Sequence, residues 1–217
     1  PPKFITSPSG YTSRYTDRNT LEVFLMAVNG KVNSLLTEQL HGLGLNAFGL
    51  CGMDGRLLLA ARKEAIQSVE NGKRKMIRDD YTGKIEQVNA DLLEMLLNAG
   101  YLPVIAPVAV SHNGEALNVD ADRAAAMVAG ALKAETLVLL TAVPGLMEKF
   151  PDESTLIKTI SRERIPAALE MAQGRMKKKV LGSEEALNAG VGRVIIADGR
   201  VENPISSALA GAGTVLQ

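Results

Sequence analysis

Strand and helix signals alternate through the second half of this 217-residue chain, and this alternation limits the possible folds more than any other feature. Apolar runs at 136–141 and 193–197 have the length and composition of strands, and each follows a helical pattern, at 121–132 and 174–188. Parallel strands need long crossover connections, which helices usually supply. The pattern therefore predicts an α/β fold, a three-layer αβα sandwich whose mostly parallel sheet is covered by helices on both faces.

The first half of the chain begins with a long amphipathic helix. Apolar residues recur at three- and four-residue spacing across 17–41, Thr16 or Asp17 can cap the start, and Gly42 and Gly44 can stop it. After it we expect a strand at 45–50 and two or three antiparallel strands over 57–78, with a turn at Asn71-Gly72. A helix at 90–99 capped by Asn89 and a buried parallel strand at 102–106 should follow. The remaining signals are a hairpin turn at Asn113-Gly114 and a last helix with Asn203 as cap and Pro204 at its first position.

Composition narrows the functional classes. Lys plus Arg and Asp plus Glu both number 24, so no global field draws the protein to nucleic acid or to a membrane surface. No apolar run approaches the ~20 residues that span a bilayer. Cys51 is the single cysteine, so no internal disulfide can form and we expect a cytoplasmic protein. The sequence has no P-loop motif and no Cys-His cluster for zinc, and we expect His41 and His112 at the surface.

Arg14 lies in a polar segment just before the long helix. A guanidinium is a planar, permanent cation, and beside a helix amino terminus it would hold a carboxylate well. An ordinary surface arginine in a polar loop explains the same residue, so chemistry alone leaves both readings open.

Asn118, Asp120 and Asp122 open an alanine-rich helix. Capping and favourable charge at a helix start explain one aspartate easily, but two aspartates with an asparagine less well. Asn118 could cap the helix or bind a polar substrate group. Asp122 could fix ammonium groups or engage a metal near bound phosphates.

The segment 174–179, Gly-Arg-Met-Lys-Lys-Lys, places cations at the start of a helix. Cations there oppose the helix dipole, so an anion such as a triphosphate is expected nearby. A solvated basic face is the alternative.

Five segments, in order along the chain, resemble the amino-acid kinase family. They are residues 13–22 (Ser-Arg-Tyr-Thr-Asp-Arg-Asn-Thr-Leu-Glu), 118–125 (Asn-Val-Asp-Ala-Asp-Arg-Ala-Ala), 139–145 (Leu-Leu-Thr-Ala-Val-Pro-Gly), 174–179 and 197–204 (Ala-Asp-Gly-Arg-Val-Glu-Asn-Pro). The resemblance covers essentially the whole chain. It is strongest for the N-acetylglutamate kinase group and, within it, for kinases that act on α-aminoadipate or glutamate attached to the amino-group carrier protein LysW.

The resemblance implies a carbamate kinase-like fold and an enzyme of lysine or arginine biosynthesis that makes an acyl phosphate from ATP, with Mg²⁺. It implies that Arg14 and Asn118 hold the substrate, that Lys179 stabilises charge on the transferring phosphoryl group and that Asp122 orients the catalytic lysines. The nucleotide would be bordered by Thr141, Ala142, Val143, Gly145 and Met176, and Ala142 stands where many relatives have Asp or Asn.

The resemblance also divides the chain into an acceptor and dimerisation lobe, 1–115, and a nucleotide-binding lobe, 116–217. The helix 17–41 would lie near a homodimer interface. Family members begin with a strand that carries a lysine and a glycine pair, followed by a second glycine-rich loop. Because neither is present here, we expect a single kinase domain that is truncated at its amino terminus, and the fragment itself could be inactive.

The expected partner is the acidic carrier LysW. Basic residues crowd the predicted hairpin and would meet it, namely Lys63, Lys73, Arg74, Lys75, Arg78 and Lys84. Lysines that block edge pairing of a solvated hairpin are the alternative. For the whole chain, the competing functions are a free-substrate N-acetylglutamate kinase and a non-catalytic ligand-binding module.

Overall fold

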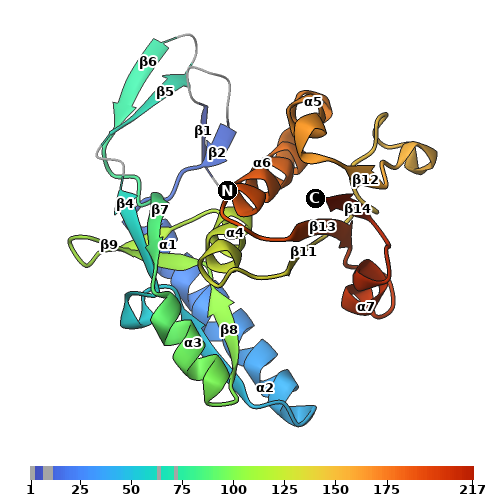
Figure 1. Cartoon of the computed structure of the whole chain (residues 1–217). Helices are drawn as coiled ribbons and strands as arrows, with labels where there is room; N and C mark the ends of the chain where they lie inside the picture. The colour runs from blue at the N-terminus through green and yellow to red at the C-terminus, as the bar shows by residue number, and fades with distance from the viewer. Residues whose placement is uncertain (1–2, 7–11, 63–64, 71–72) are drawn as a thin grey trace. The chain divides into compact units, whose positions relative to one another are not determined.

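The computed structural model describes residues 3–6, 12–62, 65–70 and 73–217. The chain divides into two compact units, Pro1–Asp120 (unit 1) and Ala121–Gln217 (unit 2). The sequence-based division after residue 115 falls in the turn between strands β9 and β10, both of which belong to unit 1. Each unit has its own sheets and helices, labelled in Figure 1.

Unit 2 contains a four-stranded sheet with the order β11-β13-β14-β12. Strand β11 (Thr136–Thr141) pairs in parallel with β13 (Arg193–Asp198), as the alternating pattern predicts. The sequence analysis did not predict the two other strands. Strand β14 (Thr214–Leu216) runs antiparallel to β13, and β12 (Thr159–Ile160) runs parallel to β14.

Helices cover both faces of this sheet (Figure 1). Along β13, Val194 and Ile196 point into one core with helices α4 (Ala121–Ala131), α5 (Ile165–Met171) and α6 (Gly174–Asn188). The alternate residues Ile195 and Ala197 pack with Ala208 of α7 (Pro204–Leu209) on the other face. Because successive strand residues point to opposite faces, this all-apolar run marks a strand that is covered twice. The three-layer α/β prediction is therefore confirmed.

Unit 1 carries the predicted long helix, but with a change of winding in its middle. Helix α1 (Arg18–Leu25) begins at the cap Asp17, whose carboxylate accepts from the Thr20 amide at 2.8 Å. The chain continues as a π-helix, η1 (Met26–Asn33), and then as α2 (Ser34–Gly42). The π-segment places the buried Asn33 side chain against the sheet, where its amide donates to the Val104 carbonyl at 2.7 Å. A helical period alone did not predict this wider turn.

The strands of unit 1 form several small sheets. One has the order β10-β9-β4-β7, where β4 (Leu58–Arg62) pairs antiparallel with β7 (Gly83–Val88) and parallel with β9 (Val108–Ser111). Strand β10 (Ala116–Asn118) closes the predicted Asn113-Gly114 hairpin with β9. The two-stranded pairs are β1 (Phe4–Thr6) with β2 (Thr12–Arg14), β3 (Ala47–Cys51) with β8 (Leu102–Ala106), and β5 (Ile66–Glu70) with β6 (Lys73–Ile77).

Most local predictions for unit 1 hold, with one error. Helix α3 (Ala90–Asn98) is capped by Asn89 as expected. Strand β8 is parallel to β3, but the prediction that it is buried is wrong except at Ala106, because β8 has one hydrogen-bonded neighbour among the described strands and Leu102 is exposed. The turn predicted at Asn71-Gly72 lies outside the described residues.

Candidate active site

Arg14 ends strand β2, where the register pairs it with Phe4 of β1. Its side chain is exposed, and within the described ranges no hydrogen bond or ion pair holds the guanidinium. The helix start that follows is already partly satisfied by its own carboxylate, Asp17, whose pKa is lowered by hydrogen bonds from Thr20. Asp17 thus serves the helix start, and Arg14 remains the residue predicted to bind the carboxylate of the substrate.

Asn118 ends strand β10, so it does not cap helix α4, one of the roles considered for it. Its backbone amide donates to the Tyr81 carbonyl at 2.8 Å. Its side-chain amide donates to the hydroxyl of Thr16 at 3.2 Å. Since Thr16 is two residues from Arg14, unit 1 brings the two predicted substrate-binding segments together.

Asp122 and Lys179 form the clearest charged pair of unit 2. Asp122 lies in the first turn of α4 and Lys179 lies in α6, and the Lys179 Nζ is 2.7 Å from the Asp122 Oδ1. The side chains are 14% and 24% exposed for Lys179 and Asp122 respectively, so the ammonium is mostly shielded but still open to solvent. The ion pair gives the Lys179 ammonium one fixed direction.

The two helices are joined by a second ion pair and by a small residue. Arg123 of α4 makes two hydrogen bonds to the Glu185 carboxylate, at 2.9 and 2.5 Å. Between the two pairs, Gly182 of α6 is fully packed against α4, where an added methyl would lie 3.5 Å from the Asp122 carbonyl oxygen. Helix packing on the carboxyl-terminal side of Lys179 therefore helps to hold the geometry of the Lys179–Asp122 pair.

The basic segment 174–179 opens helix α6 as predicted. Gly174 has a positive φ of 53°, no acidic residue lies in the first turn, and no side chain caps it. Arg175 is exposed, whereas Lys177 and Lys178 are half-buried. Met176, predicted to touch the nucleotide, packs partly buried against the core of unit 2. Because no side chain caps this helix start and its first turn carries positive charge, the start favours an anion.

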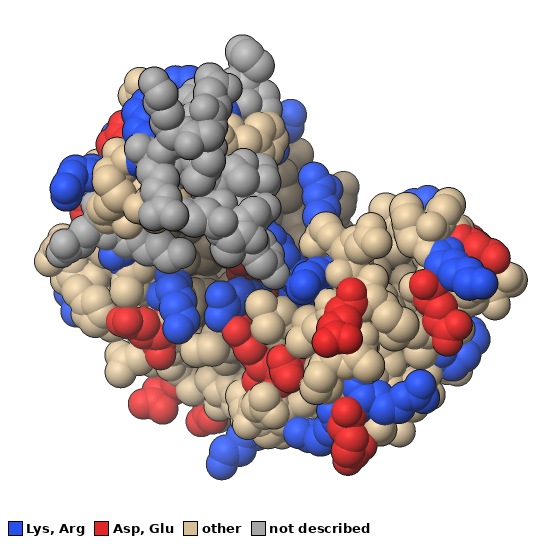
Figure 2. Space-filling model, turned by 90° about the horizontal axis from the view of Figure 1, so that it is seen from above, with Lys and Arg blue, Asp and Glu red and all other residues tan. Residues whose placement is uncertain are grey.

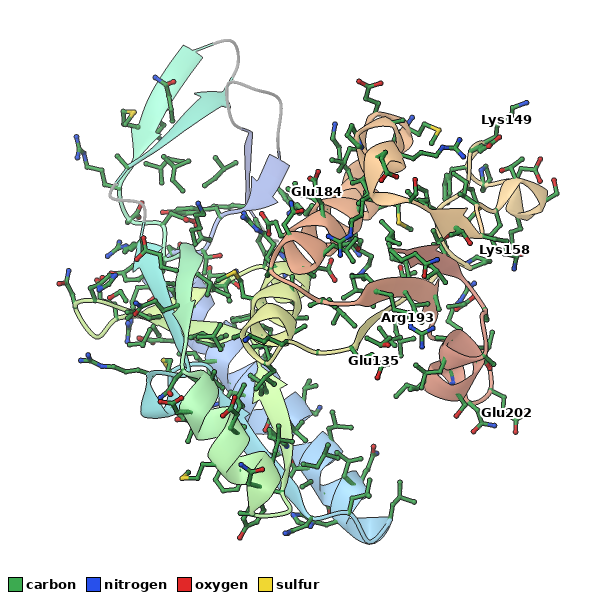
Figure 3. The ribbon with its side chains drawn as sticks, in the orientation of Figure 1. Glu135, Lys149, Lys158, Glu184, Arg193 and Glu202 are labelled. Atoms are coloured by element: carbon green, nitrogen blue, oxygen red, sulfur yellow. The ribbon has the colours of Figure 1, made fainter. Side chains whose placement is uncertain are left out.

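The turns after β11 and β13 lie at the carboxyl ends of parallel strands, the edge where open α/β sheets bind ligands. Glu135 and Arg193, labelled in Figure 3, mark the opposite, amino-terminal ends of these strands. Of the predicted nucleotide residues, Ala142 is exposed, Thr141 and Val143 are half-buried, and Gly145 is buried. Gly145 is required, because a Cβ there would lie 2.5 Å from the Thr214 hydroxyl, which accepts from the Leu146 amide at 2.9 Å.

Asp198 ends β13 beside this turn, and the sequence analysis did not single it out. Its carboxylate accepts two side-chain hydrogen bonds from Arg200, at 2.9 and 2.7 Å, and one from the Arg200 amide. These hydrogen bonds lower the pKa of Asp198 to about 2. The Gly199 amide donates to the Thr141 carbonyl at 2.7 Å and ties the two turns together. The sequence signal that could have pointed to Asp198 is its position directly after the apolar residues of β13.

Charges of both signs are interspersed on the face shown in Figure 2. In the described part of the chain, no group of three His, Cys, Asp or Glu side chains is placed to hold a metal ion. No helix in the described part is both long enough and apolar enough to cross a membrane.

His112 is exposed as expected, but it does have a partner, since its Nε2 lies 2.8 Å from the Glu86 carboxylate.

Comparison with known proteins identifies the fold and the family. The model of the amino acid kinase family matches residues 2–198. The chain belongs to the amino acid kinase family. Over its whole length it is 57% identical to the [LysW]-aminoadipate kinase of Deinococcus radiodurans and 54% identical to that of Thermus thermophilus, covering 74% and 81% of those proteins.

Solved structures show the same fold. The N-acetylglutamate synthase of Neisseria gonorrhoeae, solved with coenzyme A and N-acetyl-glutamate, superposes over the whole chain with a TM-score of 0.78 at 28% identity, and the match covers 46% of that protein. The amino acid kinase fold predicted from the five sequence segments is therefore confirmed for this family member.

Proposed function

We propose that this kinase transfers the γ-phosphoryl group of ATP to the side-chain carboxylate of α-aminoadipate carried by LysW. One carboxylate oxygen bonds to the γ-phosphorus, the bond to the β,γ-bridging oxygen breaks, and ADP and an acyl phosphate result. The observation that carries this proposal is the 57% identity, along the entire chain, to a relative named for this activity. A glutamyl group on the same carrier is the alternative acceptor, because it is shorter by one methylene.

The chemistry suits the residues that the two units present. A carboxylate with a pKa of ~4 is already ionised at neutral pH, so the nucleophile needs no general base. The barrier lies in bringing one anion to another, which calls for positioning and fixed positive charge. Arg14 would bind the acceptor's negative charge, and Asn118 would hold a polar group of the acceptor through its amide.

Lys179 would neutralise the charge that develops on the transferring phosphoryl group. Asp122 would hold that ammonium in a fixed direction through the 2.7 Å ion pair. The remaining cations at the start of α6 would attract the nucleotide phosphates. The turn from Thr141 to Gly145, with Met176, would border the nucleotide.

Mg²⁺ would accompany the nucleotide and neutralise its phosphate oxygens. Such an ion keeps several waters and is bound mainly through the substrate phosphates, so it needs few protein ligands. All other charge at the phosphates would come from lysines and backbone amides.

Two partners belong to the proposal. The acidic carrier would meet basic residues of the hairpin region, where the described side chains of Lys75, Arg78 and Lys84 are exposed. A second copy of the chain would cover the apolar residues that the long helix leaves in solvent, Met26, Val32, Leu35 and Leu36 among them. We place the protein in the cytoplasm, because its single cysteine, Cys51, is free and buried.

The test offers LysW-aminoadipate, LysW-glutamate and free N-acetylglutamate in parallel to the full-length protein. ADP release is followed with magnesium-ATP, and hydroxylamine traps any acyl phosphate. Turnover on a carrier-linked acceptor is expected. Turnover only on free N-acetylglutamate would assign the arginine-pathway kinase, and turnover on none would leave a ligand-binding protein.

A further inference from the structure

Asp80 is a buried carboxylate that the proposed chemistry does not use. It is 1% exposed and lies in the loop between the hairpin strand β6 and strand β7. Its Oδ1 accepts from the Thr16 amide at 2.9 Å, and its Oδ2 accepts from the Thr82 amide at 3.1 Å and from the Thr82 hydroxyl. A buried carboxylate is costly unless its oxygens are bonded, so this arrangement fixes the segments that supply the donors.

Those segments are the ones that carry the acceptor residues. Thr16 makes three hydrogen bonds. Its amide donates to Asp80, its carbonyl accepts from the Tyr81 amide at 2.7 Å, and its hydroxyl accepts from Asn118. The Tyr81 carbonyl in turn accepts from the Asn118 amide at 2.8 Å. The loop that holds Asp80 therefore joins the strand end at Arg14 to the strand end at Asn118.

The loop is also fixed from its other side. The Arg62 guanidinium donates to the carbonyls of Asp80 and Arg78, at 3.1 and 3.2 Å, and lies 3.9 Å from the centre of the Tyr81 ring. An ion pair of 2.7 Å to Glu115 holds Arg62 itself. A carboxylate in a loop so restrained can act as a rigid anchor, and its partner Thr16 cannot move without breaking several bonds.

We propose that Asp80 is a positioning residue for the acceptor site: it fixes Thr16, and through Thr16 it sets Arg14 and Asn118 relative to each other. This inference rests on the proposed function of those two residues as the acceptor-binding pair. Asp80 itself is too deeply buried to touch the acceptor. Its effect must therefore appear in acceptor binding and leave nucleotide binding alone, whereas a merely structural role would change both or only stability.

The test measures steady-state kinetics of full-length Asp80→Asn with the carrier-linked acceptor and magnesium-ATP. Asparagine keeps one acceptor oxygen, but its NH2 group replaces the other. That NH2 group would face a Thr16 or Thr82 donor, which then loses its acceptor. We expect the KM for the acceptor to rise about tenfold or more, as one unsatisfied buried bond would produce, with the KM for ATP changed by less than about twofold.

Two further variants keep the test decisive. Thr16→Val retains the amide that bonds Asp80 and deletes only the hydroxyl that bonds Asn118, so it should raise the acceptor KM about threefold or more, even if Asp80→Asn fails to fold. Asp54→Asn is a control for the loss of a carboxylate outside the acceptor segments, because the exposed Asp54 also accepts a backbone amide, that of Cys51 at 2.7 Å. Its acceptor KM should equal that of the wild type.

The outcomes separate this inference from the proposed function. A wild-type protein that phosphorylates no acceptor overturns the proposed function, and the role of Asp80 with it. An active wild type with an unchanged acceptor KM in folded Asp80→Asn or Thr16→Val overturns the role of Asp80 alone. An equal rise in both Michaelis constants does the same, because it would show a general loss of structure.

Discussion

The segments of unit 1 that we propose bind the acceptor and the segments of unit 2 that we propose serve phosphoryl transfer are fixed in different ways. In unit 1, the Thr16 amide donates to the buried Asp80 carboxylate, 64 residues away, and the Thr16 hydroxyl accepts from the Asn118 side chain, 102 residues away. In unit 2, two packed helices present an ammonium and a carboxylate 2.7 Å apart. The first arrangement gives position, and the second gives a fixed charge. Changes in the two regions should therefore alter different kinetic parameters.

The largest effect is expected from Lys179→Ala. Removing the fixed cation should lower kcat by about 10²–10³-fold, because charge on the transferring group loses its stabilisation, while the acceptor KM changes little. Steady-state kinetics on both substrates measure this. The exposed Lys158 of unit 2 gives a matched control, and Lys158→Ala should keep the wild-type kcat. An unchanged kcat in Lys179→Ala would remove Lys179 from the mechanism.

Arg14→Ala should show the opposite kinetic pattern. We expect the acceptor KM to rise by about tenfold or more through loss of a charge-assisted contact, with a smaller change in kcat. Arg14→Lys should recover only part of the loss, since an ammonium lacks the planar fork of the guanidinium. The exposed Arg56 of unit 1 supplies the control variant Arg56→Ala. A fall in kcat without a rise in KM would contradict the division of roles.

Two glycines test how closely the helices of unit 2 are packed. Gly130→Ala places a methyl 2.5 Å from the Ala189 Cβ and should destabilise the fold by about 1–3 kcal/mol. Gly182→Ala meets only ordinary contacts, the nearest at 3.5 Å, and should stabilise the helix by ~0.5–1 kcal/mol. Denaturant unfolding of both variants measures the difference. Destabilisation by Gly182→Ala would mean that α4 and α6 lie closer together than described.

The smallest expected effect is a pH dependence at Asp198. Its folded pKa of about 2 lies below the ordinary value of 3.8. The pairing with Arg200 therefore stabilises the fold above pH ~4 and loses this contribution as the pH falls through about 2. Thermal unfolding of wild type and Asp198→Asn should differ at neutral pH and converge in acid. A difference that is as large at pH ~2 as at neutral pH would show a non-electrostatic cause.

The elements that sequence analysis predicted well are those with local signals. Asn89 and Asp17 sit where caps belong, Asn113-Gly114 forms its turn, and the apolar runs at β11 and β13 pair in parallel. The Lys179–Asp122 contact followed from the family resemblance, since nothing local links residues 57 positions apart.

The missed features depend on long-range contacts. Strand β14 lies beside β13 although a helix separates them, and Asp80 is one of two adjacent aspartates with no local mark of burial. The π-segment within the long helix ends at Asn33, whose side chain donates to strand β8, and helical periodicity encodes neither the winding nor this contact. Such features are decided by tertiary contacts, so they became visible only in the structure.

The central claim is that the γ-phosphoryl group passes to a carrier-linked carboxylate. The most direct measurement incubates the full-length protein with γ-labelled ATP and LysW-aminoadipate, and then follows the label on the carrier before and after hydroxylamine. We expect the carrier to become labelled and hydroxylamine to release that label. Carrier that lacks the aminoadipyl group should carry no label. Label that resists hydroxylamine, or label on the unmodified carrier, would contradict an acyl phosphate at that carboxylate.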